Sequence, residues 1–404
     1  MKQSYNEEKL LTILENIQLS ETLYQKAKDR YSNLHESLTT PESNVSAYAP
    51  DIFPQGSFRL GTAIKPYNKG DAYDIDLGLI LTSGLNKSNI TQCDLRKIVK
   101  KDLEKYVESN GIKEGVNQKR RCLTINYQDG ISFHMDIVPG IPQDKQKMAY
   151  FHERMLRNEG GVINEQLANI ISDKAIAITD NESDSYEEYS DDWEPSNPQG
   201  YAKWFDARMS LNSNVITESL TRNKVATVEE LKPYQWNSPL QKAIMLLKRH
   251  RDVQYADDGV KESKPISIII TTLAAISYQG ESTVEETLLN ILDKMESFIN
   301  NHAPLVPNPV NPDEDFADKW YSEKHKDLEL ELNFRSWFKD AQRDFRSLLE
   351  QENELLFESS VNRKFNIKIA NSKLKSLGLK SAAPVTVSTP ISADSAPSHA
   401  KIIR

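Results

Sequence analysis

Two aspartates, Asp74 and Asp76, stand two positions apart in the otherwise apolar run "YDIDLGLIL". If this run forms a strand, its side chains alternate between the two faces of the sheet. Both carboxylates then point the same way, while Ile75, Leu77 and Leu79 point into the core. Like charges at this spacing raise each other's cost of ionisation unless a cation lies between them. The pattern therefore indicates a metal site.

A third aspartate repeats the arrangement in "ISFHMDIVPG", where Ser132, His134 and Asp136 share the polar face. If this strand lies beside the first, three carboxylates converge. Oxygen-rich clusters of this kind bind Mg²⁺, and two such ions can activate an attacking hydroxyl and stabilise a leaving pyrophosphate. The alternative is that Asp74 and Asp76 cap or salt-bridge a surface strand, and the presence of Asp136 favours the metal site.

A Gly-Ser pair, Gly56 and Ser57, precedes the first aspartates in "QGSFRLGT". Such a pair at a tight turn offers backbone N–H groups and a hydroxyl to a terminal phosphate. Gly-Ser is common in turns, so the pair gains weight only from its position ahead of Asp74. Together, the motifs predict metal-dependent chemistry on a nucleoside triphosphate.

The composition limits the kinds of partner. The 404-residue chain carries 50 Lys and Arg against 59 Asp and Glu, a formal charge of −9, which excludes a chain-wide basic surface for nucleic acid. The two cysteines, Cys93 and Cys122, have neither metal-ligand spacing nor a disulfide framework. We see no signal-peptide pattern at the N-terminus and no apolar run of membrane-spanning length, so we expect a cytoplasmic protein.

The elements that must position these residues follow from periodicity. Residues 7–38 predict one long amphipathic helix or two abutting helices, and residues 120–128 and 131–142 predict a hairpin around the turn signal Asp129-Gly130. Ser238-Pro239 begins a predicted helix, and the apolar residues 266–279 are interpreted as a buried helix. Further predicted segments are the strands 74–81 and 174–180, the helices 93–110, 284–300 and 320–353, and a Pro-rich connector at 302–315.

These segments predict an α+β protein with a cleft between a mixed α/β front half and a helical back half. We expect a catalytic core at residues 1–215 and a helical domain at residues 216–375. Residues 376–404 are rich in Ser, Ala and Pro and are expected to form a disordered tail.

The motif "GSFRLGT…YDIDLGL…FHMDIVPG" resembles the active-site signature of the DNA-polymerase-β-like nucleotidyltransferases. Within that superfamily the chain resembles the bacterial CD-NTases, relatives of animal cyclic GMP-AMP synthase and oligoadenylate synthetase. The segments "SNPQGYAKWF", "SPLQKAIMLLKRHRD" and "PISIIITTLAA" carry this narrower likeness. The resemblance runs from about residue 54 to about residue 277, and it implies a polymerase-β-like core followed by a helical domain.

The resemblance implies a role for each motif residue. Asp74 and Asp76 would ligate two Mg²⁺ ions, with Mn²⁺ as a substitute, and Asp136 would complete the site that activates a ribose hydroxyl. Gly56 and Ser57 would cradle the donor triphosphate.

Two further residues match phosphate contacts of the family, namely Lys248 and Ser267. Lys248 lies in "KRHRD", which a solvated helix face would also explain, and Ser267 would serve equally as a helix cap.

Other candidates are explained as well or better by structure alone. Residues 119–121, Lys-Arg-Arg, would line the nucleotide cleft or form the basic edge of a solvated hairpin. A structural role is the simpler reading of His134, and core packing is the simpler reading of Tyr201 and Trp204.

The implied function is a cyclic di- or trinucleotide synthase that uses ATP and a second NTP in bacterial anti-phage signalling of the CBASS type. A regulatory partner from the same defence operon is expected. Activation by double-stranded DNA is not expected, because the chain is acidic and lacks the Cys/His zinc insertion of the animal DNA sensor. The alternatives are an RNA- or protein-modifying nucleotidyltransferase and an inactive nucleotide-sensing scaffold.

Overall fold

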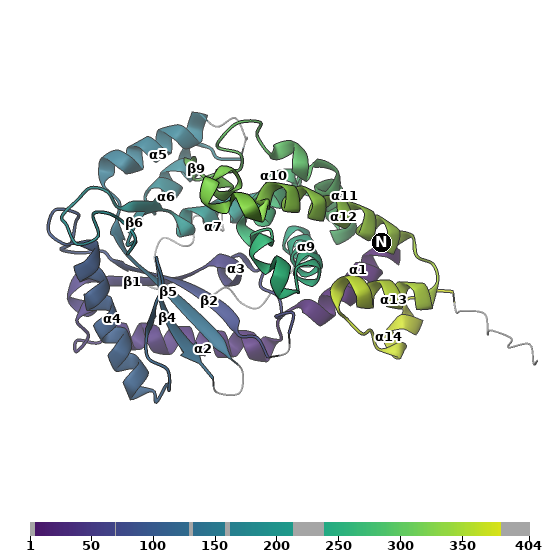
Figure 1. Cartoon of the computed structure of the whole chain (residues 1–404), viewed down its shortest axis with the longest axis horizontal. Coiled ribbons are helices and arrows are strands. Elements are labelled where there is room, and N and C mark those ends of the chain that lie inside the picture. Colours follow the sequence, from purple (N-terminus) through teal and green to yellow (C-terminus); the bar gives the residue numbers. More distant parts are fainter. Residues whose placement is uncertain (1–4, 69, 129–131, 158–161, 213–237, 381–404) are drawn as a thin grey trace, which may run out of the picture.

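A seven-stranded mixed sheet forms one half of the molecule (Figure 1). The computed structural model describes residues 5–68, 70–128, 132–157, 162–212 and 238–380. The strand order is β1-β2-β5-β4-β3, with β6 pairing to β5 and β7 pairing to β6. The strands are β1 (Pro50–Gln55), β2 (Tyr73–Leu81), β3 (Asn117–Gln118), β4 (Leu123–Tyr127), β5 (Phe133–Pro142), β6 (Ile176–Ile178) and β7 (Glu194–Ser196).

The central pair of this sheet, β2 and β5, is parallel, and every other pairing is antiparallel. The predicted hairpin is confirmed, because β4 pairs with β5 from Leu123 opposite Ile137 to Tyr127 opposite Phe133. Its turn signal, Asp129-Gly130, lies outside the described residues. The strand predicted at 174–180 is also confirmed as β6.

Two helices, α2 (Glu21–Thr39) and α4 (Gln92–Ser109), cover the face of the sheet that carries Ile75, Leu77 and Leu79 (Figure 1). The Tyr31 hydroxyl of α2 donates to the carbonyl of Ile52, 2.8 Å away, and ties the helix to β1. The opening helical stretch is therefore two helices, since α1 (Tyr5–Ile17) ends before Ser20 caps α2.

The edge strand β1 is an element that the sequence analysis missed. Its sequence, "PDIFPQ", contains two prolines, and proline is usually evidence against a strand because it cannot donate to a ladder. An edge position relaxes that restriction, because one side of the strand needs no ladder partner. β1 pairs only with β2 among the described strands.

The other half of the molecule is helical and is built around α9 (Pro239–Gln254) (Figure 1). Helices α1, α10 (Ser267–Ser277), α11 (Val284–Lys294), α12 (Leu330–Glu350) and α13 (Glu354–Phe365) all contact α9. The buried helix predicted from "ISIIITTLAAISYQ" is confirmed as α10. The other α-helices of the described residues are α3 (Gly56–Leu60), α5 (Lys145–Arg157), α6 (Glu165–Ser172), α7 (Pro198–Met209) and α14 (Asn371–Ser376).

Two predictions in this half are wrong in detail. The Pro-rich connector contains a short hairpin of β8 (Pro307–Asn308) and β9 (Asn311–Asp315), in which Asp315 accepts from the backbone N–H groups of Leu305 and Val306 at 2.6 and 2.9 Å. The helix predicted from residue 320 begins only at residue 330, because Glu329 has a left-handed backbone with φ of 45°. Two 3₁₀ turns precede it.

The C-terminal segment is ordered further than predicted. Leu377 and Leu379 are buried, and the backbone N–H of Lys380 donates to the carbonyl of Glu352 at 2.8 Å. The packed chain thus continues past the predicted boundary at residue 376, and residues 381–404 lie outside the described residues.

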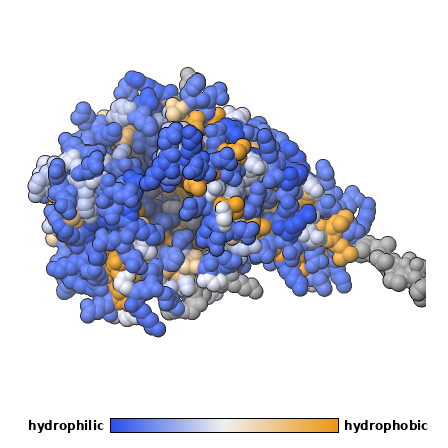
Figure 2. Space-filling model, viewed as in Figure 1, coloured by the Kyte–Doolittle hydropathy of each residue, from blue (hydrophilic) through white to orange (hydrophobic). Residues whose placement is uncertain are grey.

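The surface in Figure 2 is mostly hydrophilic and is hollowed between the two halves. Among the helices that the structure describes, none combines the length and apolar character needed to span a bilayer.

Candidate active site

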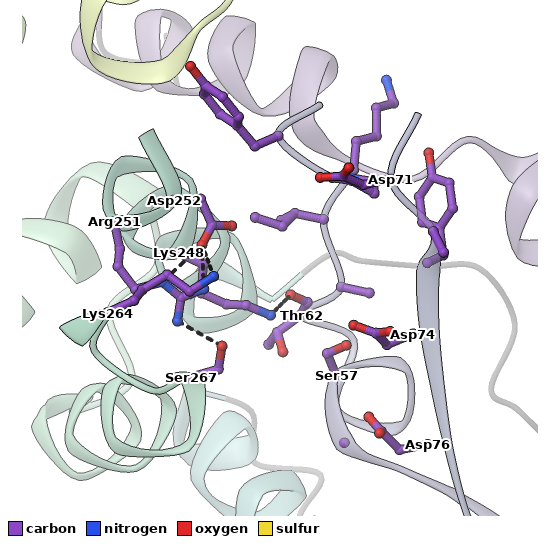
Figure 3. Close-up of a pocket in the computed structure, with 18 of the residues that line it drawn as sticks. Ser57, Thr62, Asp71, Asp74, Asp76, Lys248, Arg251, Asp252, Lys264 and Ser267 are labelled. Atoms are coloured by element: carbon purple, nitrogen blue, oxygen red, sulfur yellow. Dashed lines mark hydrogen bonds and ion pairs between the residues drawn. The ribbon is translucent and has the colours of Figure 1, made fainter. Parts of the chain in front are cut away.

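The pairing register of β2 and β5 brings the predicted aspartates together. Asp76 lies directly beside Asp136, and Asp74 lies beside His134. All seven residues predicted for the site line one cleft of about 650 Å³ between the sheet and the helical half: Gly56, Ser57, Asp74, Asp76, Asp136, Lys248 and Ser267. Figure 3 labels Ser57, Asp74, Asp76, Lys248 and Ser267 among them. The convergence inferred from two separate strands is therefore present in the fold.

Asp76 is the carboxylate most affected by its surroundings. Burial raises its pKa to about 7, and the charges of Asp74 and Asp136 act in the same direction, against smaller opposing effects from Lys248 and Lys119. A carboxyl group in this environment gains stability when a cation approaches.

The other two carboxylates already have partners. Lys119 lies against Asp136, with its Nζ 3.0 and 2.9 Å from the two carboxylate oxygens, and the Thr124 hydroxyl donates to Asp136 Oδ1 at 2.5 Å. His134 Nδ1 lies 3.3 Å from Asp74 Oδ1, so His134 contacts a predicted metal ligand.

The carboxylate oxygens of the three aspartates are suitable ligands for a hard divalent cation. The described residues contain no His, Cys, Asp and Glu group of three or more already arranged to hold a metal. The three aspartates nevertheless line one cleft, they supply only oxygen, and one of them is destabilised as an anion. Mg²⁺ prefers such ligands and takes its remaining ligands from water and phosphate.

Gly56 has two reasons to be glycine. Its φ is +61°, a left-handed conformation in which a Cβ is unfavourable. A Cβ at this position would also lie 2.2 Å from Asp76 Oδ2. The Gly-Ser turn therefore packs directly against the central carboxylate, and Ser57 follows it at the cleft surface.

The opposite wall of the cleft comes from α9 and the start of α10 (Figure 3). Lys248 is buried, and its Nζ donates to the carbonyl of Thr62 at 2.8 Å. Burial, with a smaller effect of Arg251, lowers the pKa of Lys248 to about 8. Lys248 is therefore not part of a solvated helix face.

Ser267 is held by a residue that sequence reasoning missed. Arg251 Nη1 donates to Ser267 Oγ at 2.8 Å, and Arg251 Nη2 lies 2.6 Å from Asp252 Oδ1. Lys264 Nζ lies 3.6 Å from the same Asp252 oxygen. Arg251 follows Lys248 by three positions, so the spacing of one helical turn was the available signal.

The remaining candidates are two aromatic residues of α7 and the basic residues 119–121. Tyr201 and Trp204 are buried, and Tyr201 OH lies 2.7 Å from Thr272 Oγ1, which agrees with core packing. Arg120 and Arg121 pair with Asp180 at the hairpin edge, at 2.8 and 3.2 Å, whereas Lys119 reaches into the cleft.

Comparison with known proteins shows which family has a domain similar to the one that carries this site. The family model described as "Cyclic GMP-AMP synthase DncV-like, nucleotidyltransferase domain" matches residues 50–139, the segment that carries the Gly-Ser turn and all three aspartates. This match and the relatives below all indicate a bacterial CD-NTase. The named relatives are nucleotidyltransferases.

Two curated relatives support this placement. This CD-NTase is 29% identical over 347 residues to a c-di-GMP synthase of Roseivirga ehrenbergii, covering 85% of this chain and 79% of the relative. It is 26% identical over 322 residues to the cyclic dinucleotide synthase CdnG of Bradyrhizobium diazoefficiens, covering 76% of this chain and 68% of that protein.

Solved structures confirm the predicted fold class. The structure of Bradyrhizobium diazoefficiens CdnG in complex with GTP superimposes with a TM-score of 0.62 at 21% identity, covering 93% of this chain and all of that one. An E. coli CdnC:HORMA-deltaN complex gives a TM-score of 0.54 at 14% identity, covering 89% of this chain and 96% of that one.

Proposed function

We propose that this CD-NTase is a Mg²⁺-dependent cyclic dinucleotide synthase. The observation that carries the proposal is the side-by-side position of Asp76 and Asp136 on parallel strands, with Asp74 two residues away, in a cleft whose far wall carries Lys248 and Arg251. A carboxylate wall facing a basic wall suits a metal-bound triphosphate.

The proposed reaction is two successive nucleotidyl transfers. In each, a ribose hydroxyl of one nucleotide releases its proton to solvent and forms a bond to the α-phosphorus of another, the bond from that phosphorus to the β-phosphate bridging oxygen breaks, and pyrophosphate leaves. The second transfer closes the ring. When bound at Asp74, Asp76 and Asp136, Mg²⁺ would lower the pKa of the attacking hydroxyl and stabilise the charge of the pyrophosphate.

The chain's own residues would bind and orient the triphosphate. Ser57 offers a hydroxyl at the Gly-Ser turn, while Lys248, Arg251 and Ser267 supply donors from the opposite wall. Because Lys248 is fixed to Thr62, its charge is preorganised, and little side-chain entropy remains to be lost on binding.

We propose purine triphosphates as substrates, ATP together with a second NTP. The names of two relatives, a c-di-GMP synthase and a CdnG solved with GTP, support GTP for at least one of the two steps. A cytoplasmic role in anti-phage signalling, with a regulatory partner protein, belongs to the same proposal. The CdnC:HORMA complex is the supporting precedent for such a partner.

Incubation of the purified chain with labelled ATP, GTP or both, with Mg²⁺, tests the proposal. We expect a phosphatase-resistant product with the mass of a cyclic dinucleotide, and none with EDTA. Linear chains of growing length, or label on the protein, would favour the alternative transferases. No transfer under any of these conditions would favour the scaffold.

A further inference from the structure

Lys119 occupies the side of Asp136 that faces the cleft. Its Nζ lies 3.0 and 2.9 Å from Oδ1 and Oδ2, so one ammonium group engages both oxygens of a proposed metal ligand. Both residues line the same cleft. The ammonium group therefore contacts the oxygens that a divalent cation would need.

The turn that carries Lys119 is held firmly. Arg96 of α4 is buried, and its guanidinium donates to three carbonyls of the turn between β3 and β4: those of Lys119 at 2.7 Å, Arg120 at 3.0 Å and Cys122 at 3.2 Å. The backbone N–H of Lys119 also donates to the carbonyl of Cys122 at 2.9 Å.

The side chain of Lys119 remains movable although its backbone is fixed. Its exposed fraction is 52%, against 22% for Asp136. A long, half-exposed lysine on an anchored turn can leave one anion for another by rotation about its own bonds. A nucleotide phosphate in the cleft is such a second anion.

We infer that the Lys119 ammonium group is a counter-ion that competes with the metal for the Asp136 carboxylate. It releases that carboxylate when a nucleotide enters the cleft. This inference rests on the proposed function, because it assigns the same carboxylate to a metal. Lys119 is then a positioning residue. It neutralises Asp136 while the cleft is empty and passes to a phosphate when the metal and the nucleotide arrive together.

Two consequences follow from competition. Removal of the Lys119 charge must strengthen metal binding to the nucleotide-free protein, whereas loss of a merely structural lysine would weaken it or leave it unchanged. By reciprocity of linked equilibria, a nucleotide that withdraws Lys119 must raise the affinity for metal. Part of that coupling must disappear when Lys119 is removed.

The test is a titration of free Mn²⁺ by electron paramagnetic resonance on the full chain, first alone and then with a non-hydrolysable GTP analogue. The variants are Lys119→Gln, the charge-preserving Lys119→Arg, and Lys113→Gln as a matched control on an exposed residue of the preceding loop. A half-exposed ion pair contributes up to ~1 kcal/mol, so Lys119→Gln should bind Mn²⁺ about two- to fivefold more tightly without nucleotide.

We expect Lys119→Arg and Lys113→Gln to match the wild type, and the enhancement by nucleotide to be smaller in Lys119→Gln than in the wild type. Equal or weaker Mn²⁺ binding by Lys119→Gln, including no binding by either protein, overturns the inference.

The variant Asp136→Asn separates this inference from the proposed function. If wild-type Mn²⁺ binding, with and without the analogue, is unaffected by Asp136→Asn, the proposed metal site itself is wrong. If binding falls in Asp136→Asn but is unchanged in Lys119→Gln, the metal site stands and only the role of Lys119 fails.

Discussion

Asp76 is desolvated and lies beside two other carboxylates, which raises its pKa. Through this group, the protein's free energy of unfolding depends strongly on pH. Its pKa rises from 3.8 to about 7 on folding. Below pH 4 the group is protonated in both the folded and the unfolded chain, so ionisation costs the fold nothing. Between pH 4 and pH 7 the unfolded chain releases this proton while the folded chain keeps it, so the free energy of unfolding falls across this range and is lowest above pH 7.

Asp76→Asn should therefore stabilise the metal-free protein above pH 7. A shift of about three pKa units corresponds to at most ~4 kcal/mol at pH 8, and the gain should vanish near pH 4. Thermal melting in EDTA from pH 4 to pH 8 measures it, with Asp173→Asn, an exposed surface change, as the control. An equal gain at both ends of the pH range would show that ionisation of Asp76 is not the cause.

Gly56 makes a second prediction at the residue scale. Gly56→Ala adds a Cβ that would lie 2.2 Å from Asp76 Oδ2, on a backbone with φ of +61°. The Gly-Ser turn or the Asp76 carboxylate must move to relieve this contact. A displacement of about 1 Å in an active site lowers turnover by about a hundredfold, so we expect a loss of that order.

Steady-state product formation measures this loss. Gly115→Ala is the matched control, because no atom lies within 4 Å of a Cβ added there and its φ is not positive. Turnover by Gly56→Ala equal to that of Gly115→Ala would contradict the proposed packing of the turn against Asp76.

At the scale of elements, helices and strands with a strong local pattern were predictable, and elements that depend on distant partners were not. The Ser-Pro start of α9 and the alternation in β2 and β5 are local, and the structure confirms them. β1 was missed because its prolines are tolerated only at a sheet edge. The late start of α12 depends on the left-handed backbone of Glu329, which no periodicity reveals.

The particular contacts of Lys119 and Arg251 depend on distant partners in the same way. The sequence left Lys119 between the nucleotide cleft and a solvated hairpin edge, and the pairing of β4 with β5 and the packing of α9 against α10 bring both side chains to the cleft. Asp136 was predictable because its strand pattern repeats that of Asp74 and Asp76.

The first helix shows how an element can belong to a distant part of the chain. Glu7 of α1 accepts from the backbone N–H groups of Val284 and Glu285 at 3.1 and 2.8 Å. These two groups lie in the first turn of α11, where backbone N–H groups have no acceptor within the helix itself. α1 thus caps a helix that follows it by more than 250 residues in the printed sequence.

Glu7→Ala should destabilise the protein by about 1–2 kcal/mol, the usual cost of losing a helix cap with a charged acceptor. Denaturant unfolding measures the change. Glu8→Ala is the control, since it removes the same side chain from the next position of the same helix. A loss no larger than that of Glu8→Ala would mean that the contact with α11 adds no stability.

For the whole molecule, a sheet half and a helical half are both present, and two long-range contacts cross the residue ranges expected for them. The expected boundary between the halves, at residues 215 and 216, lies outside the described residues. α1 packs with α9 and α11 although it precedes the sheet, and Leu377 and Leu379 are buried beyond the predicted end of the helical domain. Both features are long-range contacts, which a reading along the chain cannot reveal.

Paired truncations test the C-terminal boundary. A chain ending after Lys380 keeps every described residue, and we expect its melting temperature and turnover to equal those of the full chain. A chain ending after Lys375 loses Leu377 and Leu379, whose burial contributes about 1.5–3 kcal/mol each, and should melt earlier. If both truncations melt alike, the last turn adds nothing to the fold.

The central claim is that the three aspartates hold the metal on which nucleotidyl transfer depends. The most direct measurement compares cyclic product formed from labelled GTP and ATP with Mg²⁺ by the wild type, by Asp74→Asn with Asp76→Asn, and by Asp173→Asn. We predict product from the wild type and from Asp173→Asn, and none from the double variant although its far-ultraviolet circular dichroism is unchanged. Appreciable cyclic product from a folded double variant would contradict the account.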